Sequence, residues 1–118
     1  MEVWKQSLQL ASRVTRIVAR QNWEVNRGLR DQLQRASASI PSNIAEGEEQ
    51  ISNKASLKFY YIARGSLSEV RTQLILSQSL GLLGQDEFLG VDNQCELVGR
   101  LIGGVIRCRR KRDGDTAA

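Results

Sequence analysis

The chain has 118 residues, of which 41% are hydrophobic and 25% are charged, and its formal net charge is +4. This length corresponds to one domain, and the composition is ordinary for a globular protein. The sequence contains no histidine, which removes the commonest general base, the usual serine and cysteine triads and most zinc sites. We therefore expect no enzymatic activity, no cofactor and no bound metal.

The residue pattern predicts an all-α protein. Only one proline is present, and no segment alternates apolar and polar residues as a strand would. No apolar run approaches the roughly 18 residues of a membrane span, and the N-terminus lacks the basic and apolar regions of a secretory signal. The two cysteines are then expected to be free thiols in the cytoplasm.

Charge is unevenly distributed along the chain. Residues 1–35 hold seven Lys or Arg and three Asp or Glu, and residues 107–118 hold five and two. Residues 36–106 hold five basic and eight acidic residues. Both ends are therefore basic, and the middle is mildly acidic.

The first predicted helix covers residues 2–20. Its apolar residues spread over about half of the helical wheel, which is wider than contact with a single neighbouring helix needs: Val3, Trp4, Leu8, Leu10, Ala11, Val14, Ile17 and Val18. Opposite them lie Lys5, Gln9, Ser12, Arg13, Arg16 and Arg20. This polar face is either a solvated surface or a basic stripe that contacts phosphates. The absence of acidic residues after Glu2 favours the second interpretation.

Residues 21–28 lose the helical period and predict a connecting loop. We expect Trp23 and Val25 to fold back onto the core, and stacking on a nucleobase is the alternative for Trp23. The second helix, residues 29–49, contains Pro41 without a change in apolar register, which predicts a kinked helix. Its acidic end should be compensated by arginines of a neighbouring helix: Glu46, Glu48 and Glu49.

The third helix is predicted over residues 53–80, with Ser52 as its N-cap. One apolar stripe is formed by Phe59, Ala63, Leu67, Val70 and Leu74. A second stripe lies nearly opposite and consists of Leu57, Tyr61, Gly65, Ser68, Thr72, Ile75 and Ser79. A helix with two such faces is enclosed on both sides, so the second stripe predicts contact with another subunit.

The fourth helix, residues 86–111, follows a turn at residues 81–85. Cys95 lies on its apolar face and is expected to be buried. The end of this helix carries more cations than capping needs and is a candidate nucleic-acid contact: Arg107, Arg109, Arg110, Lys111 and Arg112. We expect an up-down-up-down antiparallel four-helix bundle over residues 1–112 and a disordered tail at 113–118.

Two motifs resemble a known family. They are Ser39-Ile-Pro-Ser-Asn-Ile-Ala-Glu-Gly47 and Ile62-Ala-Arg-Gly-Ser-Leu-Ser-Glu69, followed by a Thr-Gln-Leu-Ile-Leu run that ends at Leu76. With Val3-Trp-Lys near the start, they resemble the four-helix bundle proteins encoded in intervening sequences of bacterial 23S rRNA genes, also called S23 ribosomal proteins. The resemblance covers nearly the whole chain.

The resemblance implies a homopentameric ring. It also implies kinship with the accessory variability proteins of diversity-generating retroelements, which are basic bundles that bind nucleic acid and a reverse transcriptase. The matching motif residues are Pro41, Asn43, Glu46, Gly47, Arg64, Gly65 and Glu69. We interpret Asn43, Glu46, Arg64 and Glu69 as polar contacts between the second and third helices. Family members often continue with an aromatic and a basic stretch, whereas Glu48, Glu49 and Gln50 follow here, so this corner is not expected to bind nucleic acid.

Two functional hypotheses follow. The first is a non-enzymatic oligomer that binds RNA or DNA, with RNA favoured, through the basic first helix and the arginine-rich end. The second is a scaffold ring that docks a partner protein.

Overall fold

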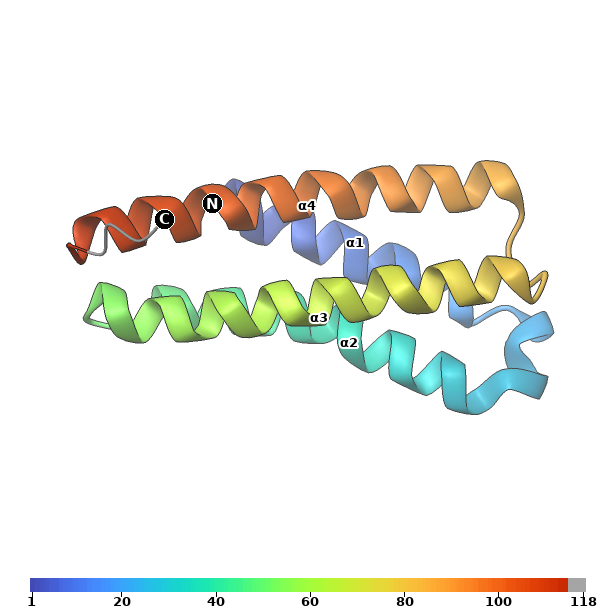
Figure 1. Cartoon of the computed structure of the whole chain (residues 1–118). Coiled ribbons are helices and arrows are strands. Elements are labelled where there is room, and N and C mark those ends of the chain that lie inside the picture. The colour runs from blue at the N-terminus through green and yellow to red at the C-terminus, as the bar shows by residue number, and fades with distance from the viewer. Residues whose placement is uncertain (115–118) are drawn as a thin grey trace.

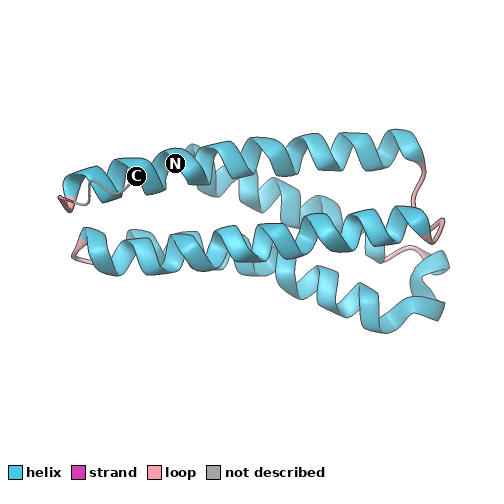
Figure 2. Cartoon of the chain, viewed as in Figure 1, coloured by secondary structure: helices cyan, strands magenta, loops and turns pink. Residues whose placement is uncertain are grey.

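The computed structural model describes residues 1–114, and this part of the chain contains helices and turns but no strand. Figures 1 and 2 show four long helices and one short 3₁₀ helix: α1 (Glu2–Val18), η1 (Gln21–Asn26), α2 (Arg27–Glu48), α3 (Asn53–Ser79) and α4 (Gln85–Arg112). α1 and α3 each pack against α2 and α4. Consecutive helices run in opposite directions (Figure 1), which confirms the predicted up-down-up-down bundle.

The core is aliphatic along most of its length. Its fully buried members include Leu10, Val14, Leu33, Ile40, Ile44, Val70, Leu74, Val98 and Ile102. Cys95 is also fully buried, as predicted. These residues come from all four helices and form one cluster, so no helix can leave the bundle without exposing apolar surface.

η1 replaces the loop predicted between the first two helices, and it closes one end of the bundle. Trp23 is fully buried there, as expected, whereas Val25 is 88% exposed and the prediction for it was wrong. A 3₁₀ helix turns by about 120° per residue, so a side chain two positions after a buried one points away from the core. Asn22 holds this end to the α3–α4 turn by donating a hydrogen bond of 3.0 Å to the carbonyl oxygen of Leu82.

Pro41 is buried inside α2, and the helix continues past it to Glu48. Figure 1 shows the first half of α2 splayed away from α3 and the second half running beside α3, as a kink would produce. Two side chains on the following turn donate to carbonyl oxygens next to the break. Ser42 bonds the oxygen of Ala38 at 3.0 Å, and Asn43 bonds that of Ser39 at 2.8 Å.

The helix ends follow local chemistry. Ser52 caps α3 as predicted, because its hydroxyl accepts a 3.1 Å hydrogen bond from the backbone N–H of Ala55. Gly81 has a φ of +77°, which a side chain would strain, and it ends α3 in a tight turn. Asp113 and Gly114 close α4 in a turn. The rest of the tail predicted to be disordered, 115–118, lies outside the described residues.

The buried face of α3 contains Ala63, Leu67, Val70 and Leu74, as predicted, and differs from the prediction only near the start of the helix. Tyr60 is fully buried, whereas Phe59 is only partly so. Leu57, assigned to the outward stripe, is 6% exposed and belongs to the core. The remaining members of that stripe are exposed from Tyr61 to Ser79.

Candidate nucleic-acid interface

The side of α1 that lies outside the core carries two parallel rows of side chains. One row consists of Trp4, Leu8, Ser12 and Arg16, at steps of four residues, and all four are exposed. The second row consists of Lys5, Gln9 and Arg13. Because residues four apart follow one ridge of a helix, each row is a continuous strip. We refer to these seven residues as the outer face of α1.

The cations of this face differ in how they are held. Lys5 and Arg16 are exposed and form no ion pair among the described residues. Arg13 is partly buried, and its Nη1 donates a 3.4 Å hydrogen bond to Oε1 of Gln94 on α4. Its guanidinium lies over Gly90, where an added Cβ would come within 2.6 Å of Nη2. Because Gly90 has no side chain, the guanidinium of Arg13 can pack against the backbone of α4.

Arg20, predicted as a phosphate contact, is instead paired with Glu87 on α4. Its Nη1 and Nη2 donate hydrogen bonds of 2.6 and 2.5 Å to the two carboxylate oxygens. These hydrogen bonds lower the pKa of Glu87 and raise the pKa of Arg20. Binding a phosphate through Arg20 would break a bidentate ion pair.

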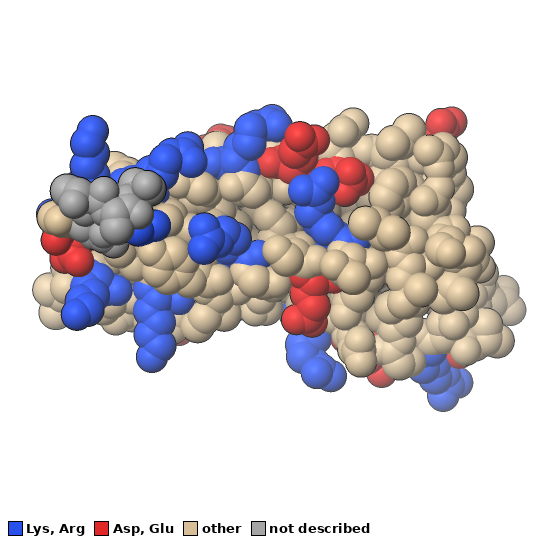
Figure 3. All heavy atoms as spheres, viewed as in Figure 1, with Lys and Arg blue, Asp and Glu red and all other residues tan. Residues whose placement is uncertain are grey.

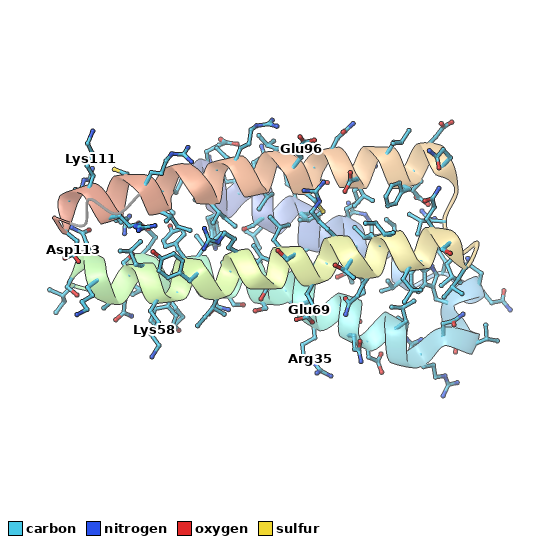
Figure 4. The ribbon with its side chains drawn as sticks, viewed as in Figure 1. Arg35, Lys58, Glu69, Glu96, Lys111 and Asp113 are labelled. Atoms are coloured by element: carbon cyan, nitrogen blue, oxygen red, sulfur yellow. The ribbon has the colours of Figure 1, made fainter. Side chains whose placement is uncertain are left out.

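The cations at the end of α4 also include both paired and exposed side chains. Arg109 is turned inward: its Nη2 donates to Oε2 of Glu48 at 2.7 Å, and its Nη1 donates to Oγ of Ser56 at 2.6 Å. Arg107, Lys111 and Arg112 are exposed, and Arg110 is partly buried. Figure 4 shows Lys111 pointing away from the bundle. The N-terminus and the end of α4 lie at the same end of the molecule (Figure 1).

Glu48 is the centre of a contact among three helices. Besides Arg109, it accepts a 2.6 Å hydrogen bond from the hydroxyl of Tyr60 on α3. The guanidinium carbon of Arg109 lies 5.7 Å from the Tyr60 ring centroid. Burial, and then the bond to Glu48, raise the pKa of Tyr60. This confirms that an arginine of another helix compensates one of the carboxylates at the end of α2.

The motif residues of α2 and α3 are mainly structural. Asn43 donates a 2.9 Å hydrogen bond to Oγ of Ser39, whose hydroxyl lies 2.9 Å from that of Ser66 on α3. Asn43 therefore supports the α2–α3 contact indirectly, through Ser39.

Three other motif residues do not join the helices in this way. Arg64 lies over the ring of Tyr61 within α3, with its guanidinium carbon 5.1 Å from the ring centroid. Glu46 and Glu69 are exposed and form no ion pair or side-chain hydrogen bond among the described residues. The predicted polar contacts therefore reduce to Asn43 and its serine partners.

The outward stripe of α3 and the residues beside it include several exposed apolar side chains. Tyr61, Ile62, Ile75, Leu76 and Leu80 are between 37% and 55% exposed. Gly65, Ser68 and Thr72 lie between the two groups of apolar residues, and an added Cβ at Gly65 would have nothing within 4 Å. In Figure 3, charged side chains cluster on the half that carries the end of α4, whereas the half with the C-terminal end of α3 is largely uncharged.

Sequence patterning missed two residues of the outer face of α1. Trp4 and Leu8 were assigned to the apolar stripe, yet they are 40% and 38% exposed. The available signal was the width of that stripe, which exceeded what one neighbouring helix needs. Among the described residues, no three His, Cys, Asp or Glu side chains are grouped to hold a metal ion. No helix in residues 1–114 is long and apolar enough to cross a membrane.

Comparison with known proteins places the chain among proteins of the same architecture. The sequence matches the family of 23S rRNA-intervening sequence proteins over residues 1–104. The fold is similar to a crystal structure of a protein with unknown function, from the S23 ribosomal protein family of Bacteroides thetaiotaomicron VPI-5482. That similarity has a TM-score of 0.81 at 21% identity and covers 88% of this chain and 97% of the other. No curated protein matches the chain.

Proposed function

The chain belongs to the 23S rRNA-intervening sequence protein family, and we propose that it is a non-enzymatic oligomer that binds nucleic acid, RNA in particular, with little sequence specificity. The observation that carries this proposal is the outer face of α1. It presents Lys5, Arg13 and Arg16 without a carboxylate among its seven residues. Phosphate contacts of this kind provide affinity but carry little sequence information.

The exposed cations at the end of α4 support the same function. Arg107, Lys111 and Arg112 lie at the end of the molecule where α1 begins (Figure 1). Arg20 and Arg109 are left out of the proposed contacts, because each is already bonded to a carboxylate. The proposed surface is therefore smaller than the sequence predicted.

Salt-dependent binding to a labelled fragment of 23S rRNA tests the proposal. The affinity should fall linearly with salt on logarithmic axes, between about 50 and 200 mM. Changing Lys5 and Arg16 to Gln together should lower the slope by roughly 1 to 2 and weaken binding at least about fivefold near 0.1 M salt.

The matched control changes Arg35 and Lys58 to Gln. Both are exposed, form no ion pair among the described residues and point away from the bundle in Figure 4. This pair should bind as the unchanged protein does. Absence of binding at low salt, or equal weakening by the two pairs of changes, would contradict the proposal.

Self-association is the second part of the proposed function. The outward stripe of α3, with its large apolar side chains and small residues between them, is the surface we assign to contact between subunits. The family resemblance leads us to expect a ring of five. Repetition of a modest basic face around such a ring would raise the overall affinity for a long nucleic acid by multivalency.

A scaffold that docks a partner protein is the second candidate function. It is favoured by an apolar group at the end of the bundle opposite the termini, where Val25, Leu80 and Leu89 are 88%, 54% and 46% exposed. A partner recovered after nuclease treatment, and lost when Val25 and Leu89 are changed to Glu, would support this candidate. Retention of the partner by that variant would count against it.

A further inference from the structure

We propose that the outer face of α1 binds a single strand of nucleic acid, with Trp4 as a stacking platform for a base. This inference rests on the proposed function and adds the form of the ligand. Phosphate contacts alone do not distinguish a single strand from a duplex, because both present a charged backbone. The distinction comes from the uncharged side chains that accompany the cations.

Trp4 is the first of these side chains. It is 40% exposed, and Leu8, one turn further along the same row, is 38% exposed. A single strand presents the faces of its bases, and stacking on an aromatic ring contributes roughly 1–3 kcal/mol per base. A duplex would instead bring its phosphates and sugars against this apolar surface. These polar groups would lose bound water without gaining a compensating contact.

The polar side chains extend this surface. A shallow depression between α1 and α4 is lined by Leu8, Gln9, Ser12, Arg13, Arg16 and Gln94. Amide and hydroxyl groups both donate and accept hydrogen bonds, so they can pair with base edges, which are free in a single strand and occupied in a duplex. The amide of Gln94 is already oriented toward this depression by its hydrogen bond from Arg13.

The order of the residues also suits an extended strand. From Trp4 to Arg16 the row rises by about 18 Å along the helix axis. Its apolar members are at the N-terminal end, and its arginine is at the other. Lys5 and Arg13 run alongside on the second row. A strand lying along α1 would therefore stack a base near Trp4 while its phosphates follow the cations.

Two RNA probes of one sequence test the inference: a labelled 12-nucleotide single strand, and the same strand paired with its complement. The unchanged protein should bind the single strand about tenfold or more tightly than the duplex. Trp4→Ala should weaken single-strand binding by about fivefold or more and leave duplex binding unchanged. Arg16→Gln should weaken both, because it removes a phosphate contact.

Tryptophan fluorescence supplies a direct readout. Trp23 is fully buried and Trp4 is exposed, so a stacked base should quench only the emission of Trp4. Trp4→Phe should abolish the quenching while keeping most of the affinity, since a stacking ring remains. Val25→Ala shortens an exposed apolar side chain in η1, at the other end of α1 from Trp4, and is the matched control that should change neither signal.

The outcomes separate this inference from the proposed function. Equal binding of the two probes, unaffected by Trp4→Ala, would overturn the single-strand assignment and leave the proposed function standing. Failure of both probes to bind at low salt would overturn both. A change in subunit number on Trp4→Ala, measured by light scattering, would assign Trp4 to a subunit contact and would also overturn the inference.

Discussion

The ring of Tyr60 packs directly against the backbone of Gly47. A Cβ at Gly47 would lie 3.0 Å from both Cδ2 and Cε2 of the ring and 3.3 Å from the carbonyl oxygen of Ser56. Tyr60 is fully buried, so the ring has no free space to move into. This close approach lets the Tyr60 hydroxyl reach Glu48.

Gly47→Ala should therefore lower the free energy of unfolding by about 1–3 kcal/mol, through overpacking against Tyr60. Gly28→Ala is the matched control, because a Cβ there would have nothing within 4 Å. In a helix this control should be neutral or slightly stabilising. Urea unfolding of both variants measures the difference. Equal stability of the two would show that the Tyr60 ring does not require glycine.

Arg109→Gln should reduce stability, because it removes the charged partner of Glu48 and the contact with the Tyr60 ring. The arginine side chain is 18% exposed and that of Glu48 is 31% exposed. For such a partly buried pair we expect a loss of about 1–2 kcal/mol. Arg112→Gln removes an equal charge from an exposed site and should leave stability within about 0.5 kcal/mol.

The effects of the same two variants on RNA affinity should rank in the opposite order to their effects on stability. Arg112→Gln should lower the affinity for RNA, whereas Arg109→Gln should have a smaller effect, because Arg109 is already occupied. An equal loss of affinity in both would show that Arg109 leaves Glu48 to contact phosphate.

The two cysteines should react at very different rates. Cys95 is fully buried, and burial, followed by the charge of Asp92, raises the pKa of its thiol to about 12. Cys108 is exposed. Because the thiolate is the reactive form, an aromatic disulfide reagent near pH 8 should titrate one thiol in the folded chain and two in urea. Rapid reaction of both in the folded protein would contradict the burial of Cys95.

Alkaline pH should destabilise the protein. The pKa of Cys95 is about 12 in the folded chain against an ordinary value of 9.0, so the unfolded chain loses this proton first. The buried, protonated thiol of Cys95 therefore contributes fully to the free energy of unfolding below about pH 9, and this contribution is lost as the pH rises toward 12. Thermal melting of Cys95→Ala should show a shallower loss of Tm above pH 9. An unchanged slope would mean that Cys95 is not the group responsible.

Ile75→Glu should dissociate the oligomer, because it places a charge within the proposed subunit contact. Ile75 is 55% exposed in the single chain, so the substitution should cost little stability if the subunit folds alone. Light scattering should show five subunits for the unchanged protein and one for the variant. Leu89→Glu is the matched control on another helix, where Leu89 is 46% exposed, and it should remain assembled.

The helices and the kink of α2 were predictable because they depend on local pattern. The apolar register passes through Pro41 unchanged, which indicates that the helix continues, and the proline lacks an N–H and clashes with the preceding turn, which bends the helix. Ser52 was predictable as a cap for a similar reason, since capping involves residues three apart.

The polar contacts were not predictable to the same degree. Arg109 and Glu48 are 61 residues apart, and Arg20 and Glu87 are 67 apart. The sequence indicated that the carboxylates at the end of α2 need cations. Which arginine pairs with them depends on the position and rotation of α4 in the bundle, which the sequence does not show. On α3, Tyr60 precedes the buried Ala63 by three residues and Phe59 precedes it by four, so helical spacing alone did not show which of the two aromatic side chains is buried.

Pro41 also divides α2 into two parts that can open separately. Without its N–H, the hydrogen-bond ladder is interrupted between the splayed first half and the second half, which is held by Tyr60 and Arg109 through Glu48. Local opening of the first half need not disturb the second. In amide hydrogen exchange, α2 should therefore behave as two segments, with faster exchange before Pro41 than after it.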